Sequence, residues 1–232
     1  METSDTRAQS HFMAIKSASL PKVSRATWIG LCLSLFALLL IRQMILYFAP
    51  VLTTGSAVLK ETLLWVSAVA LLLIVRRGEH LPFKSIGLGT SRWWKSIFWG
   101  LVIALTCAVV GGVLAAVTGY GHGPGSAAFE KLPLWLITLI VLRAGIVEEL
   151  FYRGCSIERL QAIGLKPIWA AAIPLIIFAL GHSTGGMANI LIALALGGIL
   201  TGFYMWRRDL VANMIGHGLV DFVANVLPAL FS

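Results

Sequence analysis

Two adjacent carboxylates, Glu148 and Glu149, stand inside an otherwise apolar stretch of about residues 134–153. A carboxylate in hydrocarbon costs at least about 2.5 kcal/mol on insertion scales, so an acid inside a membrane span is read by default as functional. Arg153 follows Glu149 by four residues, which predicts an ion pair on one helix face. Glu148 points about 100° away and has no cation three or four residues later, so it is expected to serve as a general base. Arg143 also stands near the two acids in the sequence. If it pairs with Glu148 or Glu149, the two acids no longer divide into one paired and one free carboxylate.

Two further pairs of residues stand at helical spacing in later apolar stretches. Phe178 precedes His182 by four residues and His217 precedes Asp221 by four, so each pair is expected on one helix face. Together with Glu148 they would lie on three helices, which a bundle could bring to one cavity. The candidate catalytic residues are Glu148, Glu149, Arg153, His182, His217 and Asp221.

This set of residues suits two mechanisms that both use water as the attacking group. His182 and His217, with a carboxylate, could hold a Zn²⁺ ion that keeps one position open for water. Without a metal, Glu148 with His182 could deprotonate the water, while His217 with Asp221 stabilises an oxyanion. No serine or cysteine stands beside a base in a recognisable pattern, so an acyl-enzyme is the weaker choice. The residues leave the metal and the metal-free mechanism open.

The composition indicates which elements must position these side chains. Of the 232 residues 58% are hydrophobic and 12% are charged, and the mean hydropathy is +0.88. Repeated apolar stretches of roughly 17 to 25 residues are long enough to cross a bilayer, so an all-α, polytopic transmembrane bundle is expected. The net charge of +8 is ascribed to short loops beside the spans rather than to nucleic-acid binding. The three cysteines lack CxxC spacing, which argues against disulfides and a thiolate metal site.

Hydropathy predicts about seven spans in one bundle. They cover approximately residues 27–48, 57–75, 94–117, 134–153, 168–182, 188–206 and 210–230. The expected organisation is a cytosolic tail over residues 1–26, three spans within 27–129 and a catalytic core of about four spans within 130–232. A cytosolic N-terminus puts most of the lysines and arginines on the cytosolic side, as the positive-inside rule requires.

If all spans are straight, His182 and Glu148 are expected at different depths in the membrane. At 1.5 Å per residue, His182 lies about 21 Å along its span from Ile168, whereas Glu148 lies only about 8 Å from Arg153. Either the fourth span continues past Arg153 toward Leu160, or the fifth span starts late and tilts.

Other residues in the spans have structural interpretations. Arg42 is expected to snorkel or to pair structurally, as is Arg143. Asn213 is expected to form hydrogen bonds between helices, and Gly197 with Gly198 to permit close helix packing.

The candidate residues resemble the motifs of the CPBP intramembrane proteases, a family that includes the type 2 CAAX prenyl proteases and the bacteriocin-processing, or Abi, proteins. The motif Glu-Glu-x-x-x-Arg matches Glu148, Glu149 and Arg153; Phe-x-x-x-His matches Phe178 and His182; and His-x-x-x-Asn or Asp matches His217 and Asp221. The resemblance covers roughly residues 130–230.

By this resemblance, Glu148 would be the water-activating base and His182 its partner or a metal ligand. Glu149 and Arg153 would position the helix. Asp221 stands where the eukaryotic CAAX-processing branch has Asn, which favours metal ligation or a bacterial-type member of the family.

The resemblance implies an intramembrane endopeptidase, a metalloprotease with Zn²⁺ in some descriptions of the family, in a bacterial plasma membrane. Its partners would be a peptide or membrane-protein substrate, with or without a lipid, and the bilayer; a CAAX-type, leader or pheromone peptide would all serve. Two other classes stay open. Charged residues inside spans also mark the ion pathways of transporters, although no inverted repeat is visible here. A catalytically silent scaffold or immunity protein is the third class.

Overall fold

The computed structural model describes residues 23–120, 129 and 131–231, and its regular elements are all helices over this part of the chain. The predicted all-α fold is confirmed. The elements are α2 (Arg25–Phe48), α3 (Thr54–Leu73), η1 (Ile74–Gly78), η2 (Phe83–Ile86), α4 (Trp93–Thr118), α6 (Leu134–Arg143), η3 (Ala144–Ile157), α7 (Glu158–Ala162), α8 (Pro167–Leu180), η4 (Ser183–Gly185), α9 (Gly186–Arg207), α10 (Leu210–Asp221), η5 (Phe222–Val226) and α11 (Leu227–Ala229). Most of the expected tail, residues 1–26, lies outside the described residues.

Among the described residues, five helices are long and apolar enough to cross a membrane. They are Arg25–Phe48, Thr54–Gly78, Trp93–Thr118, Ser183–Arg207 and Leu210–Ala229. The shorter apolar helix α8 and the continuous helix formed by α6, η3 and α7 bring the number of helical segments to about seven, in agreement with the sequence. The chain is an integral membrane protein.

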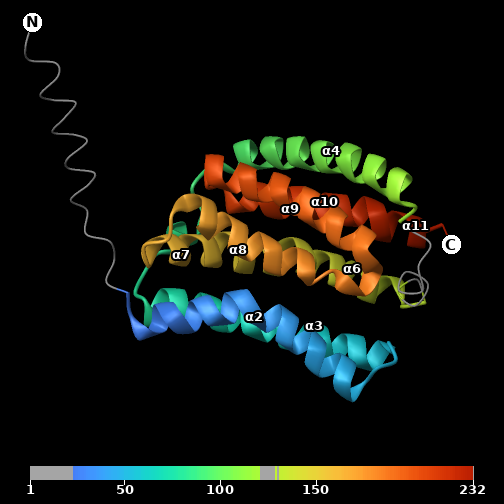
Figure 1. Cartoon of the computed structure of the whole chain (residues 1–232), viewed down its shortest axis with the longest axis horizontal. Helices are drawn as coiled ribbons and strands as arrows, with labels where there is room; N and C mark the ends of the chain where they lie inside the picture. Colours follow the sequence, from blue (N-terminus) through green and yellow to red (C-terminus); the bar gives the residue numbers. More distant parts are fainter. Residues whose placement is uncertain (1–22, 121–128, 130, 232) are drawn as a thin grey trace, which may run out of the picture.

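The helices lie side by side with similar axis directions (Figure 1). α2 and α3 form one layer, the α6–η3–α7 helix and α8 lie in the middle, and α9, α10 and α4 form the layer on the other side. Helices α2, α3, α8 and α10 all contact η3. The segment that carries the two glutamates is therefore the centre of the bundle.

The η3 segment is a π-helix in which 13 of 14 residues are buried. Two glycines permit this close packing. A Cβ on Gly145 would lie 2.9 Å from the Cα of Gly218 on α10, and one on Gly154 would lie 2.9 Å from the backbone oxygen of Ile86. π-helical turns are often found at functional sites, because the wider turn redirects side chains relative to an α-helix.

The continuous helix removes the predicted difference in depth. The fourth span extends past Arg153 to Ala162, which is the first of the two possibilities given above. α8 therefore runs beside the C-terminal part of this span. The ring of Phe178 on α8 lies 5.5 Å from that of Tyr152 on η3. The motif of α8 is thus level with the end of the Glu-Glu-x-x-x-Arg motif.

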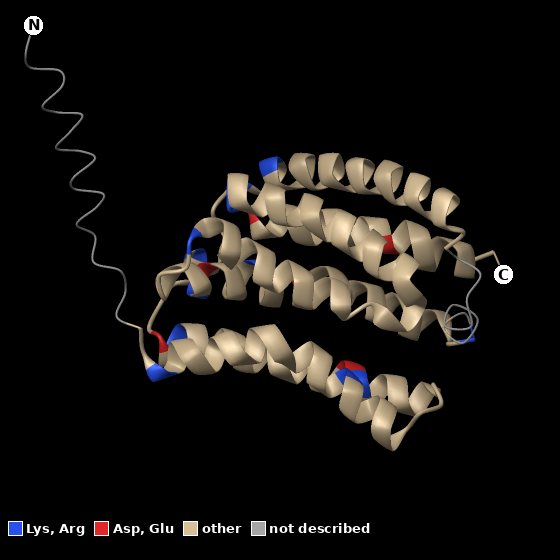
Figure 2. Cartoon of the chain, in the orientation of Figure 1, with Lys and Arg blue, Asp and Glu red and all other residues tan. Residues whose placement is uncertain are grey.

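Lysine and arginine residues gather at the end of the bundle where α2 and α4 begin (Figure 2). The opposite end carries few charged residues in the described part of the chain. The positive-inside rule favours this basic end as the cytosolic one.

With seven spans and a cytosolic N-terminus, a reporter fused after Ser232 is expected on the outer side of the membrane. The measurement pairs alkaline phosphatase, which is active outside, with green fluorescent protein, which fluoresces in the cytosol. Fusion after Gly89, between η2 and α4, is the cytosolic control. A fluorescent but phosphatase-negative fusion at Ser232 would contradict the topology.

Candidate active site

Glu149 is fully buried and is held by charged and polar side chains of η3 and α10. Arg153 Nη1 donates to its Oε1 at 2.8 Å, and His217 Nδ1 lies 2.8 Å from the same oxygen. Asn213 Nδ2 donates to its Oε2 at 3.0 Å. The predicted ion pair between Glu149 and Arg153 is present. Because a buried carboxylate without partners is strongly destabilising, these bonds explain how the protein tolerates Glu149 in its core.

Arg153 connects the same carboxylate to two further helices. Its Nη2 donates to the backbone oxygen of Gly197 at 3.1 Å, and its Nε donates to Thr201 Oγ1 at 3.3 Å, both on α9. Its guanidinium carbon lies 4.5 Å from the ring centroid of Phe178 on α8. A planar guanidinium suits this position, since it can donate in its plane and stack on an aromatic face at once.

Glu148 has a different arginine partner, which corrects the expectation that it lacks a cation. Arg143 Nη1 donates to Glu148 Oε1. In an α-helix, residues five apart point about 140° from each other, but the π-helical turns of η3 bring these two together. The division into one paired and one free acid is therefore wrong. The two acids still differ, since Glu148 is 9% exposed and Glu149 has no exposed surface.

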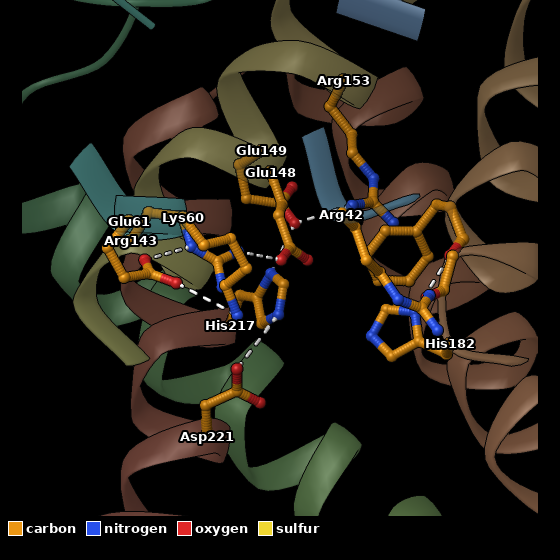
Figure 3. A network of polar contacts seen from close by, with 12 residues as sticks. Arg42, Lys60, Glu61, Arg143, Glu148, Glu149, Arg153, His182, His217 and Asp221 are labelled. Carbon is orange, nitrogen blue, oxygen red and sulfur yellow. Dashed lines mark hydrogen bonds and ion pairs between the residues drawn. The ribbon is translucent and has the colours of Figure 1, made fainter. Parts of the chain in front are cut away.

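A third carboxylate joins the Glu148 side of the site from α3 (Figure 3). Arg143 Nε donates to Glu61 Oε2 at 2.8 Å, and Lys60 Nζ lies 3.4 Å from Glu61 Oε1. Glu61 was missed in the sequence, although it is an acid inside the predicted span 57–75. The insertion cost that drew attention to Glu148 would have identified it equally well.

His217 faces a carboxylate with each of its ring nitrogens. Nδ1 lies against Glu149, and Nε2 lies 3.5 Å from Asp221 Oδ2, four residues later on α10. The predicted pairing of His217 and Asp221 on one helix face is present. Asp221 closes the lower end of the group in the close view (Figure 3).

His182 lies apart from the two glutamates (Figure 3). It stands in the turn after α8 rather than on the helix, which ends at Leu180. Nδ1 of His182 lies 2.9 Å from the backbone oxygen of Phe178. The backbone oxygen of His182 accepts a hydrogen bond from Asn189 Nδ2 at 3.0 Å. Arg42 of α2 donates to the backbone oxygen of Gly181 beside it. In the described structure no hydrogen bond joins His182 to Glu148, so the direct pairing expected between them is absent.

The ring of Phe178 lies close to both histidines. Its centroid is 4.7 Å from that of His182 and 6.2 Å from that of His217. The same ring also contacts Arg153 and Tyr152. The three sequence motifs therefore meet around an aromatic ring, which lies close to both histidines.

The residues expected to hold Zn²⁺ do not fit a metal site in this arrangement. His217 has a carboxylate at each nitrogen, and His182 lies in the turn after α8, where no hydrogen bond or ion pair joins it to a carboxylate among the described residues. Within the described residues, no group of three or more His, Cys, Asp or Glu side chains is placed to hold a metal ion.

The fold and site define an all-helical membrane protein with a buried group of acids, arginines and one imidazole, that of His217. Residues 130–223 match the family model of the type II CAAX prenyl endopeptidase Rce1-like proteins. The resemblance to the CPBP family is thereby confirmed for this segment, which holds every candidate catalytic residue, while α2, α3 and α4 lie outside it. Neither the curated proteins nor the solved structures give a match to the chain.

Gly197 and Gly198 form a matched pair for testing the packing around Phe178. A Cβ on Gly197 would lie 2.8 Å from the Phe178 ring, whereas one on Gly198 would meet nothing within 4 Å. Gly197→Ala is therefore expected to destabilise the protein by about 1–3 kcal/mol, as overpacking does, and Gly198→Ala to leave it unchanged or slightly more stable. Thermal unfolding of both variants in the same detergent gives the comparison. Equal midpoints would contradict the close contact.

Proposed function

We propose that the protein is an intramembrane endopeptidase that hydrolyses a peptide bond with a water molecule activated by Glu148. The observation that carries the proposal is the arrangement of two adjacent carboxylates in the centre of a membrane bundle. Glu149 is enclosed and holds an imidazole, while Glu148 keeps some exposure. The match to a family of endopeptidases over residues 130–223 supports the same reaction class.

Glu148 is the proposed general base. Arg143 engages its Oε1, and among the described residues no hydrogen bond engages its Oε2. This oxygen can accept a proton from water, which attacks the carbonyl carbon as the proton passes to Glu148. The bond between carbon and nitrogen then breaks, and the proton goes from Glu148 to the leaving amine. In a buried site the few waters that reach Glu148 act as reagents rather than as solvent.

His217 is the proposed stabiliser of the oxyanion. The carboxylates of Glu149 and Asp221 stand at the two ring nitrogens of His217, so a proton on the imidazole would be balanced by negative charge on both sides. A protonated imidazole fixed by Glu149 is a preorganised positive charge for the tetrahedral intermediate.

His182, which lies beside Phe178 and apart from the glutamates, is proposed to contact the substrate. Its Nδ1 is directed at the backbone of α8, so its Nε2 remains available to a peptide carbonyl or leaving group. Hydrogen bonds of catalytic residues are often completed only when substrate binds, which suits the distance between His182 and the glutamates.

The proposed substrates are peptides or membrane-protein tails that reach the site in the bilayer. The family match favours a C-terminal CAAX-type peptide with a prenyl group. A leader or pheromone peptide is the alternative within the same reaction class.

Glu148→Gln is expected to lower cleavage by about 10²–10⁴-fold, because the amide keeps the shape of the side chain but cannot take a proton from water. The assay uses purified protein in detergent with a farnesylated CAAX peptide and, in parallel, the membrane peptidome of cells with and without the variant. Glu158→Gln is the control: this acid pairs with Arg208 and Tyr204 away from the site, and activity should persist. Full activity of Glu148→Gln would refute the proposed role. Ion-dependent uptake without cleavage would instead indicate a transporter.

A further inference from the structure

The acid Glu61 is buried in a part of the chain that the family match does not cover. It lies in α3, is 1% exposed, and belongs to a helix whose other residues are mostly apolar. A carboxylate in that position is destabilising unless it has a strong partner. Its partner, Arg143, belongs to the helix that continues into η3, so Glu61 connects the N-terminal layer of the bundle to the site.

Arg143 bridges two carboxylates with different nitrogens of one planar group. Its Nε donates to Glu61 and its Nη1 donates to Glu148. The guanidinium is rigid, so fixing one edge on Glu61 also fixes the direction from which the other nitrogen reaches Glu148. Arg143 is itself buried, with 7% exposure, and has little freedom to move.

The bridge also limits how many hydrogen bonds Arg143 gives to Glu148. With Nε occupied by Glu61, Arg143 contacts Oε1 of Glu148 alone. Without Glu61, the guanidinium would be free to turn and bind both oxygens of Glu148 in the usual bidentate manner. Both oxygens would then be occupied, and neither would be open to water.

We infer that Glu61 is a positioning residue of the proposed active site: it holds Arg143 so that Arg143 orients Glu148 through one oxygen and leaves the other for water. The inference rests on the proposed function, since it concerns the same general base. It assigns to α3, outside the matched segment, a part in the reaction. The side chain of Lys60 is 25% exposed and lies 3.4 Å from Glu61. In the described structure Lys60 forms no hydrogen bond with Arg143 or Glu148.

The test compares Glu61→Gln with Lys60→Gln, its neighbour, in detergent-solubilised full-length protein. Cleavage of a farnesylated CAAX peptide is measured as kcat and KM separately. Glu61→Gln is expected to lower kcat by about 10- to 100-fold, as a misplaced catalytic group does, with KM changed less than about threefold. Lys60→Gln should retain both constants. Glu61→Asp, which keeps the charge, should recover much of the lost kcat and serves if Glu61→Gln does not fold.

A second measurement needs no activity. Thermal unfolding of Glu61→Gln, Glu148→Gln and the double variant forms a double-mutant cycle. Because both acids bind one guanidinium, the fall in unfolding midpoint of the double variant is expected to differ from the sum of the single falls. The matched cycle of Lys60→Gln with Glu148→Gln should be additive.

The outcomes separate the inference from the proposed function. If the wild type cleaves, Glu148→Gln is inactive and Glu61→Gln keeps the wild-type kcat, Glu61 does not position the base. If Glu148→Gln keeps full activity, the proposed function fails, whereas a non-additive cycle would still establish the bridge. Additive unfolding effects together with an unchanged kcat would overturn the inference.

Discussion

The burial of charge in an apolar bundle is the constraint on which the rest of the structure depends. Hydrocarbon and close-packed side chains cannot solvate a carboxylate, so each buried acid requires a cation or several hydrogen-bond donors. For the three acids of the site, the protein meets this requirement with two arginines from one continuous helix. Arg153 serves Glu149, and Arg143 serves Glu148 and Glu61.

These pairings connect the layers of the bundle as well as neutralising charge. Arg153 contacts α9 and stacks on α8, Glu149 contacts α10, and Arg143 contacts α3. The packing of η3 at the centre, which Gly145 and Gly154 allow, brings all of these helices within reach. The site is therefore assembled by the same contacts that hold the bundle together, and a change to Arg143, Glu149 or Arg153 is expected to affect stability as well as the proposed reaction.

The sequence predicts a large part of this arrangement. Hydropathy locates the helices to within a few residues at most ends, because the length of an apolar run is set by the bilayer. Spacing by four residues predicts the pairs Glu149–Arg153 and His217–Asp221, and both are present. The second pair lies on the α-helix α10, whereas the first forms within the π-helical η3.

The other contacts of the site depend on features that the sequence around each residue does not show. The π-helical turns of η3 place Arg143 beside Glu148, and α-helical counting cannot show this. α8 ends at Leu180, so His182 occupies a turn instead of the helix face. Glu61 did have a signal, an acid in an apolar span, but its partner lies 82 positions away along the chain. Which buried acid meets which arginine is a property of the packed bundle.

The central claim is that the buried carboxylate of Glu149 binds Nδ1 of His217 and so orients this imidazole for the proposed reaction. ¹⁵N NMR of histidine-labelled protein in nanodiscs measures this directly, with the His217 signal assigned by its loss in His217→Gln. We predict a protonated Nδ1 that exchanges slowly with solvent in the wild type and loses this protection in Glu149→Gln. An unprotonated or rapidly exchanging Nδ1 in the wild type, unchanged by Glu149→Gln, would contradict the account.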